Sequence, residues 1–318
     1  MGKKILVLGG AGFIGSNIVE HFVKKKYNVT IIDGLLKHTG GRIENLKNVI
    51  NNINFIYSKI ENVRDIDNLL ESSDIIIDTM AWTSHLKSID NPYYDLKLNC
   101  YSHLSWLQYS DCLREKKIFY LSSRSVYGNP DCEIITEDIC PQPYDIQGVH
   151  KLCSENYFKF YSRVNELDVV VLRIPNSFGP KQKLKGDDIG LIGNFIQASL
   201  QDKKIEIFGN NRIKTFAYVE DIVNAIDLLI ETDYKGYNIF NIGGFEILLK
   251  KLADLIIKIT GLGNIVVKDM PDKIKNVDSG NLPIDDSKLK KIIGEYKKTD
   301  LETALTKTIK YFYKEMTI

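Results

Sequence analysis

A glycine-rich segment near the N-terminus has the residue types and the spacing of a phosphate-binding turn. Gly9, Gly12 and Gly15 follow the apolar stretch 4–8, a predicted strand, and an apolar pattern typical of a helix begins at Phe13. Glycines at this spacing permit a tight turn, let the backbone approach a pyrophosphate, and bring the helix close to the strand. The free N–H groups at the start of the helix favour an anion. The segment therefore predicts a dinucleotide site, and the alternative is a glycine-rich turn in some other α/β protein.

An acidic residue ends the second predicted strand, residues 27–33. Asp33 lies about 20 residues beyond the glycine turn, where a carboxylate can bind both hydroxyls of an adenosine ribose. The same carboxylate would repel a ribose 2′-phosphate, so Asp33 favours NAD over NADP as the cofactor. Lys37 and Arg42 in the following loop keep NADP open.

Short apolar stretches alternate with amphipathic ones along the first three quarters of the chain. Further strands are expected at 53–57, 75–77, 117–121, 168–174 and 237–242, and helices near 64–70, 92–113, 147–163 and 219–230. This alternation predicts an α/β fold with a doubly wound parallel (Rossmann-type) sheet. The polar residues 122–125 follow the fifth strand and so should lie at the carboxyl edge of the sheet, where such folds bind ligands.

The remaining segments predict a smaller, mainly helical C-terminal substrate lobe. A loop rich in Gly, Lys and Asp precedes an expected helix at 191–200 and a strand at 205–208, and lysine-rich helices follow Phe245. We expect a dinucleotide-binding domain formed by 1–175 with 212–245, and a lobe formed by 176–211 with 246–318. The two domains are therefore interleaved along the chain.

Composition narrows the class of partners. The 318 residues carry a net charge of +1, which argues for neither a nucleic-acid nor a membrane surface. We find no apolar run long enough to span a bilayer and no cleavable leader, so we expect a cytoplasmic protein. The five cysteines show no metal-ligand spacing, which predicts reduced thiols and no structural metal.

Several motifs, taken in order, resemble the extended short-chain dehydrogenase/reductase superfamily, in its NAD-dependent nucleotide-sugar epimerase and dehydratase branch. The likeness covers almost the whole chain and rests on 8–16 (LGGAGFIGS), 122–128 (SSRSVYG), 172–180 (LRIPNSFGP), 190–196 (GLIGNFI) and 216–221 (FAYVED). It implies hydride transfer at C4 of a nucleotide-activated sugar, for the synthesis of surface-glycan precursors. It also implies a homodimer formed through the helices near 93–113 and 147–163.

The resemblance further implies roles for individual residues. Those expected to bind NAD are Gly9, Gly12, Phe13, Ile14, Gly15, Asp33, Ile60 and Asn99, with Lys151 on the nicotinamide ribose. Ser123 would hydrogen-bond the sugar hydroxyl at the reacting carbon, and the other substrate-binding residues would be Arg124, Asn176, Asn194, Phe208, Lys214 and Lys275. Lys214 and Lys275 stand where the family has arginines on the diphosphate, and lysine lacks the bidentate fork. Arg212 is a candidate to compensate.

The chain departs from the family at its catalytic Tyr-x-x-x-Lys motif, which here reads Gln147-Gly148-Val149-His150-Lys151. Glutamine cannot ionise, so Gln147 can orient a hydroxyl but cannot remove its proton. Four candidates remain for the proton acceptor: Tyr144, His150, His85, and a water held by Gln147 and Ser123. Each side chain also has an ordinary alternative, which is loop packing for Tyr144, a surface or interface contact for His150, and a structural loop position for His85.

Two consequences for the reaction follow from these departures. The family's 4,6-dehydratases carry acidic residues where this chain has Arg124 and Ser125, so dehydration is not favoured. The resemblance leaves a 4-epimerase, a 4-dehydrogenase or a ketoreductase. The alternative from another class is a catalytically inactive member that acts as a nucleotide-sugar-binding sensor or subunit partner.

Overall fold

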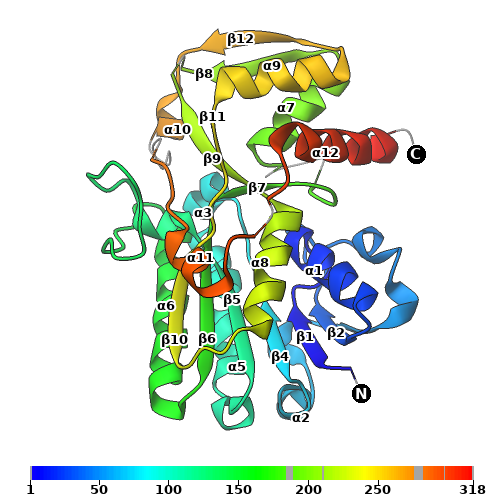
Figure 1. Ribbon diagram of the computed structural model, residues 1–318, viewed down its shortest axis with the longest axis vertical. Helices are drawn as coiled ribbons and strands as arrows, with labels where there is room; N and C mark the ends of the chain where they lie inside the picture. The colour runs from blue at the N-terminus through cyan, green and yellow to red at the C-terminus, as the bar shows by residue number, and fades with distance from the viewer. Residues whose placement is uncertain (1, 184–188, 210, 276–281, 297, 317–318) are drawn as a thin grey trace.

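A seven-stranded parallel sheet forms the centre of the larger part of the molecule (Figure 1). The computed structural model describes residues 2–183, 189–209, 211–275, 282–296 and 298–316. The strands are β1 (Lys4–Leu8), β2 (Asn28–Asp33), β3 (Ile53–Tyr57), β4 (Ile75–Asp78), β5 (Lys117–Ser123), β6 (Asp168–Ile174) and β10 (Tyr237–Asn241). Their order is β10-β6-β5-β4-β1-β2-β3, and every neighbouring pair is parallel. The predicted doubly wound sheet is confirmed, and its order reverses between β1 and β4, where such sheets bind ligands at their carboxyl ends.

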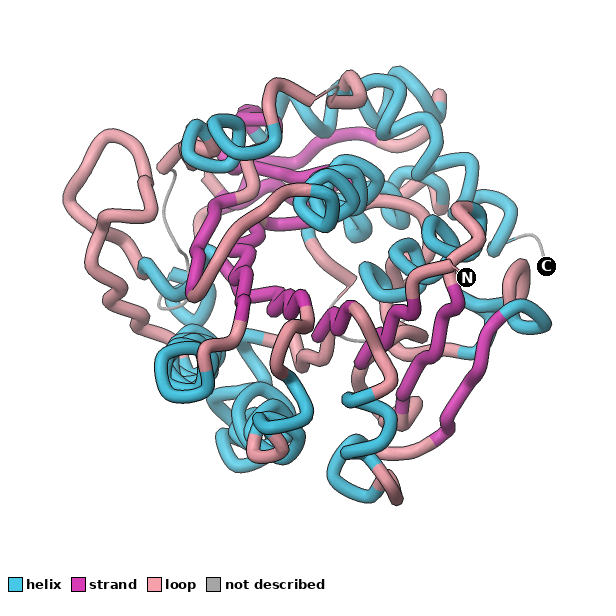
Figure 2. Tube along the Cα trace, turned by 60° about the horizontal axis from the view of Figure 1, so that its bottom comes forward, coloured by secondary structure: helices cyan, strands magenta, loops and turns pink. Residues whose placement is uncertain are grey.

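Helices cover both faces of this sheet (Figure 2). Ile5 and Val7 of β1 pack with α1 (Phe13–Lys24), α8 (Val219–Glu231) and α11 (Ser287–Ile293). Leu6 and Leu8, which alternate with them, pack on the other face with α2 (Ile66–Glu71), α5 (Ser102–Leu107) and α6 (Ile146–Asn165). A strand that is buried on both faces needs apolar residues at every position, which explains its unbroken apolar sequence.

The helix predicted from Pro92 to about Leu113 corresponds to four successive segments, of which the first three form one helix that ends at Leu107. They are α4 (Pro92–Leu96), a π-helical turn (Lys97–Tyr101), α5, and a 3₁₀ turn (Ser110–Leu113). The amphipathic pattern is insensitive to such a change because a π turn inserts one residue without ending the helix. The predicted helix is therefore present over 92–107, where its π turn contains the buried Asn99, and the prediction is wrong beyond Leu107.

The lobe has its own apolar core, formed by α7 (Leu191–Leu200), α9 (Leu249–Thr260) and α12 (Leu301–Met316) packed on two small sheets. The small sheets are β11-β9-β7 and β12-β8, with β7 (Asn176–Phe178), β8 (Lys204–Phe208), β9 (Ile213–Tyr218), β11 (Phe245–Leu248) and β12 (Asn264–Lys268). Sequence analysis did not identify β7, β9, β11 or β12, because each is short and pairs only across long sequence distances. The division of the chain at 175, 211 and 245 stays a prediction.

The shorter helical segments connect these layers. They are α3 (His85–Asp90), α10 (Asp272–Lys275) and the 3₁₀ turns Ile43–Leu46, Ile50–Asn52, Ile60–Asn62 and Arg124–Tyr127. None of the helices in the described ranges is long and apolar enough to cross a membrane.

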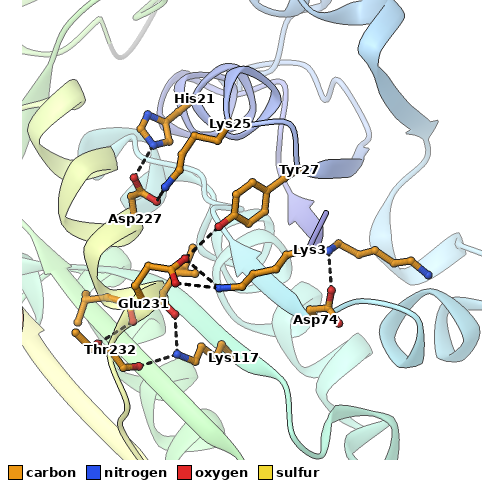
Figure 3. A network of polar contacts seen from close by, with 12 residues as sticks. Lys3, His21, Lys25, Tyr27, Asp74, Lys117, Asp227, Glu231 and Thr232 are labelled. Carbon is orange, nitrogen blue, oxygen red and sulfur yellow. Dashed lines mark hydrogen bonds and ion pairs between the residues drawn. The ribbon is translucent and has the colours of Figure 1, made fainter. Parts of the chain in front are cut away.

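Ion pairs at the amino ends of the strands hold α1 and α8 against the sheet (Figure 3). Lys3 Nζ lies 3.0 Å from Glu231 Oε1, and Lys25 Nζ lies 2.5 Å from Asp227 Oδ1. Lys117 Nζ donates to the carbonyls of Ile230 and Thr232, each at 2.6 Å. These contacts lie at the amino edge of the sheet, at the end opposite to the lobe (Figure 1).

Candidate active site

A cleft of about 510 Å³ runs along the carboxyl edge of the large sheet and continues onto the lobe. This volume lies within the range of ligand pockets. The predicted site residues that line it are Gly9, Gly12, Phe13, Ile14, Gly15, Asp33, Ile60, His85, Ser123, Arg124, Gln147, Lys151, Asn176 and Lys214. Residues from 9 to 214 along the chain therefore meet in one cleft.

The glycine turn forms one end of this cleft. Gly9 has φ +77°, which side-chain-bearing residues rarely adopt, and a Cβ atom on Gly15 would lie 2.3 Å from the Gly9 carbonyl oxygen. The Thr79 hydroxyl donates to the carbonyl of Gly9 at 3.0 Å and to that of Leu8 at 2.8 Å. The glycines therefore keep the backbone of the turn compact and open to a ligand at the start of α1, which fits a dinucleotide pyrophosphate.

Asp33 lies at the end of β2 and connects the glycine turn to the loop that follows. Its two carboxylate oxygens accept hydrogen bonds from the backbone N–H groups of Ala11 (2.9 Å) and Leu35 (2.8 Å). Burial raises the pKa of Asp33, while these two hydrogen bonds oppose the shift. Each oxygen keeps a further lone pair, so the carboxylate can still accept from ribose hydroxyls in the cleft.

Lys151 is a buried base of the cleft with a strongly lowered pKa. Its Nζ donates to the Leu121 carbonyl at 3.0 Å and lies 4.8 Å from the centroid of the Tyr120 ring. Burial lowers the pKa of Lys151 to about 8, and the carboxylates of Asp78, Asp95 and Glu155 oppose this shift. The hydrogen bonds described for the Lys151 ammonium go to backbone carbonyls. The ammonium can therefore also donate to hydroxyl groups of a ligand in the cleft.

The end of β5 brings a polar turn to the same place. Ser123 is the N-cap of the turn Arg124–Tyr127, and its Oγ accepts from the N–H of Ser125 at 3.1 Å. The Ser125 hydroxyl lies 3.0 Å from the same Oγ. These contacts fix the Ser123 hydroxyl at the cleft wall.

Gln147 also faces the cleft, but its amide nitrogen has a backbone partner. Nε2 donates to the Trp82 carbonyl at 2.9 Å, and the Asn99 amide donates to the same carbonyl at 2.8 Å. The Asn99 side-chain oxygen in turn accepts from the Trp82 N–H at 3.0 Å. Asn99 therefore holds the connection between β4 and α3 in place. It is absent from the described residues that line the cleft.

The three side chains considered as proton acceptors are placed differently. His85 lines the cleft, and its Nδ1 lies 2.8 Å from Asp145 Oδ2. His150 pairs with the buried Asp95 at 2.6 Å, and Tyr144 is 44% exposed beside Gly128. Neither His150 nor Tyr144 is among the described residues that line the cleft, so the structure does not bring these two candidates to the site.

Comparison with known proteins agrees with this arrangement. Residues 5–243 match the NAD dependent epimerase/dehydratase family. The chain belongs to this family. A putative UDP-glucose 4-epimerase of Methanocaldococcus jannaschii is 33% identical over 276 residues, which are 84% of this chain and 86% of that protein.

Further relatives show that the family covers more than one reaction. The crystal structure of UDP-glucose 4-epimerase from Thermotoga maritima with UDP-glucose superposes with a TM-score of 0.87 at 30% identity, covering 98% of this chain and 99% of that one. UDP-glucuronic acid decarboxylase 1 of Xenopus tropicalis is 27% identical over 99% of this chain and 73% of its own length. The comparisons therefore establish the fold and the NAD-dependent epimerase/dehydratase family, but they do not determine which reaction this protein catalyses.

The lobe contributes fewer of the predicted residues than the family pattern implies. Asn176 and Lys214 line the cleft, and Arg212 lies there as well. Asn194, Phe208 and Lys275 are not among its described lining residues, and Lys275 is exposed and pairs with Asp272 at 3.1 Å. The prediction that Lys275 binds the diphosphate therefore receives no support from this arrangement.

Sequence analysis also missed residues that shape the site. Asp145 caps α6, its Oδ1 accepting from the Gly148 N–H at 2.6 Å while Oδ2 contacts His85. An aspartate just before a predicted helix is a recognisable N-cap signal, but only the fold shows that it meets a histidine 60 positions earlier. Thr79 follows β4 at the carboxyl edge, a position that could have been predicted from the strand pattern alone.

Proposed function

We propose that this protein uses NAD to transfer hydride at C4 of a UDP-activated hexose and so interconverts the two C4 epimers. The observation that carries the proposal is the meeting of the glycine turn, Asp33, Ser123 and Lys151 in one cleft that continues to Lys214 on the lobe. The relatives named as UDP-glucose 4-epimerases support both the reaction and the nucleotide.

The proposal gives a task to each region of the cleft. The turn at Gly9–Gly15 and Asp33 would hold the pyrophosphate and adenosine ribose, and Lys151 would hold the nicotinamide ribose. NAD supplies the hydride acceptor when it is bound. Ser123 would orient the reacting sugar hydroxyl, and the cations Arg212 and Lys214 would neutralise the sugar diphosphate. Arg124 and Ser125 offer no carboxylic acid to the sugar, which disfavours loss of water from it.

Turnover of nucleotide sugars tests the proposal. The purified protein is incubated with NAD and with UDP-, GDP-, CDP- and dTDP-hexoses, and the products are identified by NMR while absorbance reports NADH. We expect a UDP-hexose to be converted into its C4 epimer without net accumulation of NADH, because hydride returns to the sugar. Accumulation of NADH together with a 4-keto sugar would instead show a dehydrogenase.

Gln147 at the position of the family's tyrosine favours a second candidate, a binding protein without turnover. Calorimetric titration with NAD and with each UDP-hexose separates the two functions. Tight binding of both ligands, with every sugar recovered unchanged, would support the second candidate and refute the first. Failure to bind NAD or any nucleotide sugar would refute both.

We also propose that two copies associate through the outer surface of α4 to α6. Exposed apolar side chains gather on these elements, namely Tyr93, Leu96, Tyr101, Tyr109, Val149, Phe160 and Val164. A grouping of this kind is typical of an interaction surface because single exposed apolar residues are normally scattered. Light scattering should give twice the 36.3 kDa mass of the chain.

Charge placed in this surface should separate the copies. Tyr101→Glu combined with Phe160→Glu is expected to give the monomer mass, because two carboxylates would be buried without partners. Val267→Glu, on the exposed side of β12, is the matched control and should leave the mass unchanged. A monomeric wild-type protein at micromolar concentration would contradict the proposal.

A further inference from the structure

The loop between β2 and the first 3₁₀ turn, residues 34–42, forms one wall of the cleft beside Asp33. Its residues 34, 36 and 38–41 line the cleft. Leu35 and His38 in this loop have φ values of 45° and 66°, a backbone conformation that residues with side chains rarely adopt. Because such conformations persist where surrounding contacts hold them, the position of this loop depends on its partners in the rest of the fold.

Contacts with nearby segments fix the two ends of loop 34–42. At its start, the Leu35 N–H donates to Asp33 Oδ1 at 2.8 Å. At its end, the Arg42 N–H donates to the carbonyl of Ala11 in the glycine turn at 3.1 Å. The middle of the loop, around Lys37, is held by a partner from another element.

This partner is Tyr94 of α4. Its hydroxyl donates to the Lys37 carbonyl at 3.0 Å. Burial raises the pKa of Tyr94, so the hydroxyl keeps the proton that it donates. The loop follows β2 and α4 follows β4, and these two strands lie on opposite sides of β1 in the sheet. The bond therefore connects the two sides of the switch point, where doubly wound folds bind a dinucleotide.

The ring of Tyr94 also contacts the connection between β4 and α3. It packs edge-on against Trp82, with ring centroids 4.9 Å apart and ring planes at 82°. The Trp82 carbonyl accepts hydrogen bonds from the side-chain amides of Asn99 and Gln147. One side chain therefore touches both the loop beside Asp33 and the connection that holds Gln147.

We propose that Tyr94 is a positioning residue for the cofactor, because it holds loop 34–42 in the conformation to which NAD binds. The inference rests on the proposed function for the identity of the ligand. It extends that function to a residue outside the cleft, since Tyr94 is not among the described residues that line it. Tyr94 therefore acts through the loop.

Preorganisation is the physical basis of this role. Without the hydroxyl, the middle of the loop depends on short-range contacts such as that from the Thr39 hydroxyl to the Leu36 carbonyl. The loop then samples other conformations in the cofactor-free protein, and NAD binding has to restore the ordered one. The net contribution of one hydrogen bond corresponds to a change of about 2- to 10-fold in a dissociation constant.

Calorimetric titration with NAD measures the effect on binding. Tyr94→Phe removes the hydroxyl and keeps the ring against Trp82, so it should raise the dissociation constant for NAD about 2- to 10-fold. Tyr27→Phe is the matched control, because it removes the hydrogen bond from a tyrosine hydroxyl to Glu231 at the opposite edge of the sheet (Figure 3). The control should bind NAD as the wild type does, and both variants should bind a UDP-hexose with unchanged affinity.

Hydrogen exchange in the absence of NAD tests the contact itself. Amides of residues 34–42 should exchange faster in Tyr94→Phe than in the wild type, while those of the large sheet should exchange at the same rate. Saturating NAD should remove most of this difference, because the ligand then orders the loop. A general loss of stability would instead speed exchange throughout the molecule, so the pattern separates positioning from a merely structural role.

Steady-state kinetics separates the hydroxyl of Tyr94 from its ring. With saturating NAD, the kcat of Tyr94→Phe should stay within about 2-fold of the wild type, since the ring still packs on Trp82. Tyr94→Leu removes both contacts and should lower kcat as well, because the connection that holds Gln147 loses a packing partner. We therefore expect phenylalanine, but not leucine, to preserve kcat.

The outcomes separate this inference from the proposed function. An unchanged NAD affinity in Tyr94→Phe, or unchanged exchange of residues 34–42, would overturn the inference and leave the function intact. A Tyr94→Phe protein that loses kcat while it binds NAD normally would overturn it too. A wild-type protein that binds no NAD would refute the proposed function, and the exchange measurement would still decide whether Tyr94 holds the loop.

Discussion

Lys151→Met is expected to reduce kcat by about 10²-fold or more and yet to make the cofactor-free protein more stable at pH 7. The side chain is 3% exposed, and burial lowers its pKa to about 8. A fall from the ordinary value near 10.5 corresponds to a cost of about 3 kcal/mol for keeping the ammonium charged in the folded state. Methionine fills a similar volume without that cost, but it cannot hold a ribose hydroxyl, and a misplaced ligand reacts slowly.

The sign of the pH dependence follows from proton binding. Below pH 8 the lysine is protonated in both the folded and the unfolded chain, and the full cost applies. Between pH 8 and about 10.5 the unfolded chain binds more protons than the folded one, so the wild-type protein gains stability as the pH rises. The stability difference between Lys151→Met and the wild type should therefore be largest below pH 8 and decrease as the pH rises from 8 to about 10.5.

Urea unfolding of both proteins across this pH range measures the difference directly, because contributions of other groups cancel. Lys310→Met, at an exposed position of α12, is the matched control and should change neither kcat nor the pH dependence of stability. A Lys151→Met protein that is less stable than the wild type at pH 7, with a pH-independent difference, would contradict the prediction.

Arg173→Met is expected to lower the free energy of unfolding by about 3–5 kcal/mol, because it leaves the Glu155 carboxylate buried without its cation. Both residues are 2% exposed. The guanidinium donates to the two carboxylate oxygens at 2.6 and 3.1 Å, and its Cζ lies 4.6 Å from the centroid of the Tyr127 ring. Breaking such a pair by removing one partner is far more costly than replacing both.

The same substitution should also lower turnover. The Ser122 hydroxyl donates to Glu155 Oε1 at 2.5 Å, and Ser122 directly precedes Ser123. An uncompensated Glu155 is expected to take up a proton or move, and either change disturbs the serine turn at the cleft. Equilibrium unfolding in urea and steady-state kinetics measure the two effects.

Two controls show whether burial is the cause. The double variant Glu155→Leu with Arg173→Met should recover most of the lost stability, since no unpaired charge remains. Lys258→Met breaks the exposed pair with Glu302 and should cost little, because solvent screens both charges. Equal losses in Arg173→Met and Lys258→Met would refute the explanation.

Much of the fold could be predicted because its signals are local. Each of these signals lies within one short stretch of sequence. The glycine spacing indicates the turn that ends in α1, Asp33 ends the next strand, and the apolar periodicity marks the strands themselves. The lobe strands β7, β9, β11 and β12 and the π turn at Asn99 escaped prediction, because pairing and burial across long sequence distances stabilise them.

In the candidate site, too, some features could be predicted from local signals and others depend on the fold. The positions of Ser123, Gln147 and Lys151 follow from the strand and helix that carry them, so their meeting at the carboxyl edge was predictable. His85, His150 and Tyr144 were all left open as candidates, since residue type says nothing about which neighbour a side chain faces. The fold separates them by pairing His150 with Asp95, leaving Tyr144 exposed, and bringing His85 to Asp145 in the cleft.

The order of residues is thus sufficient to indicate a parallel α/β sheet and a dinucleotide turn, and the replacement of the family's tyrosine by Gln147 stays a prediction. Which imidazole lies at the cleft depends on contacts between residues 60 positions apart, and burial sets the low pKa of Lys151. Both are properties of the packed chain, because desolvation and the direction of a side chain arise only when distant segments come together.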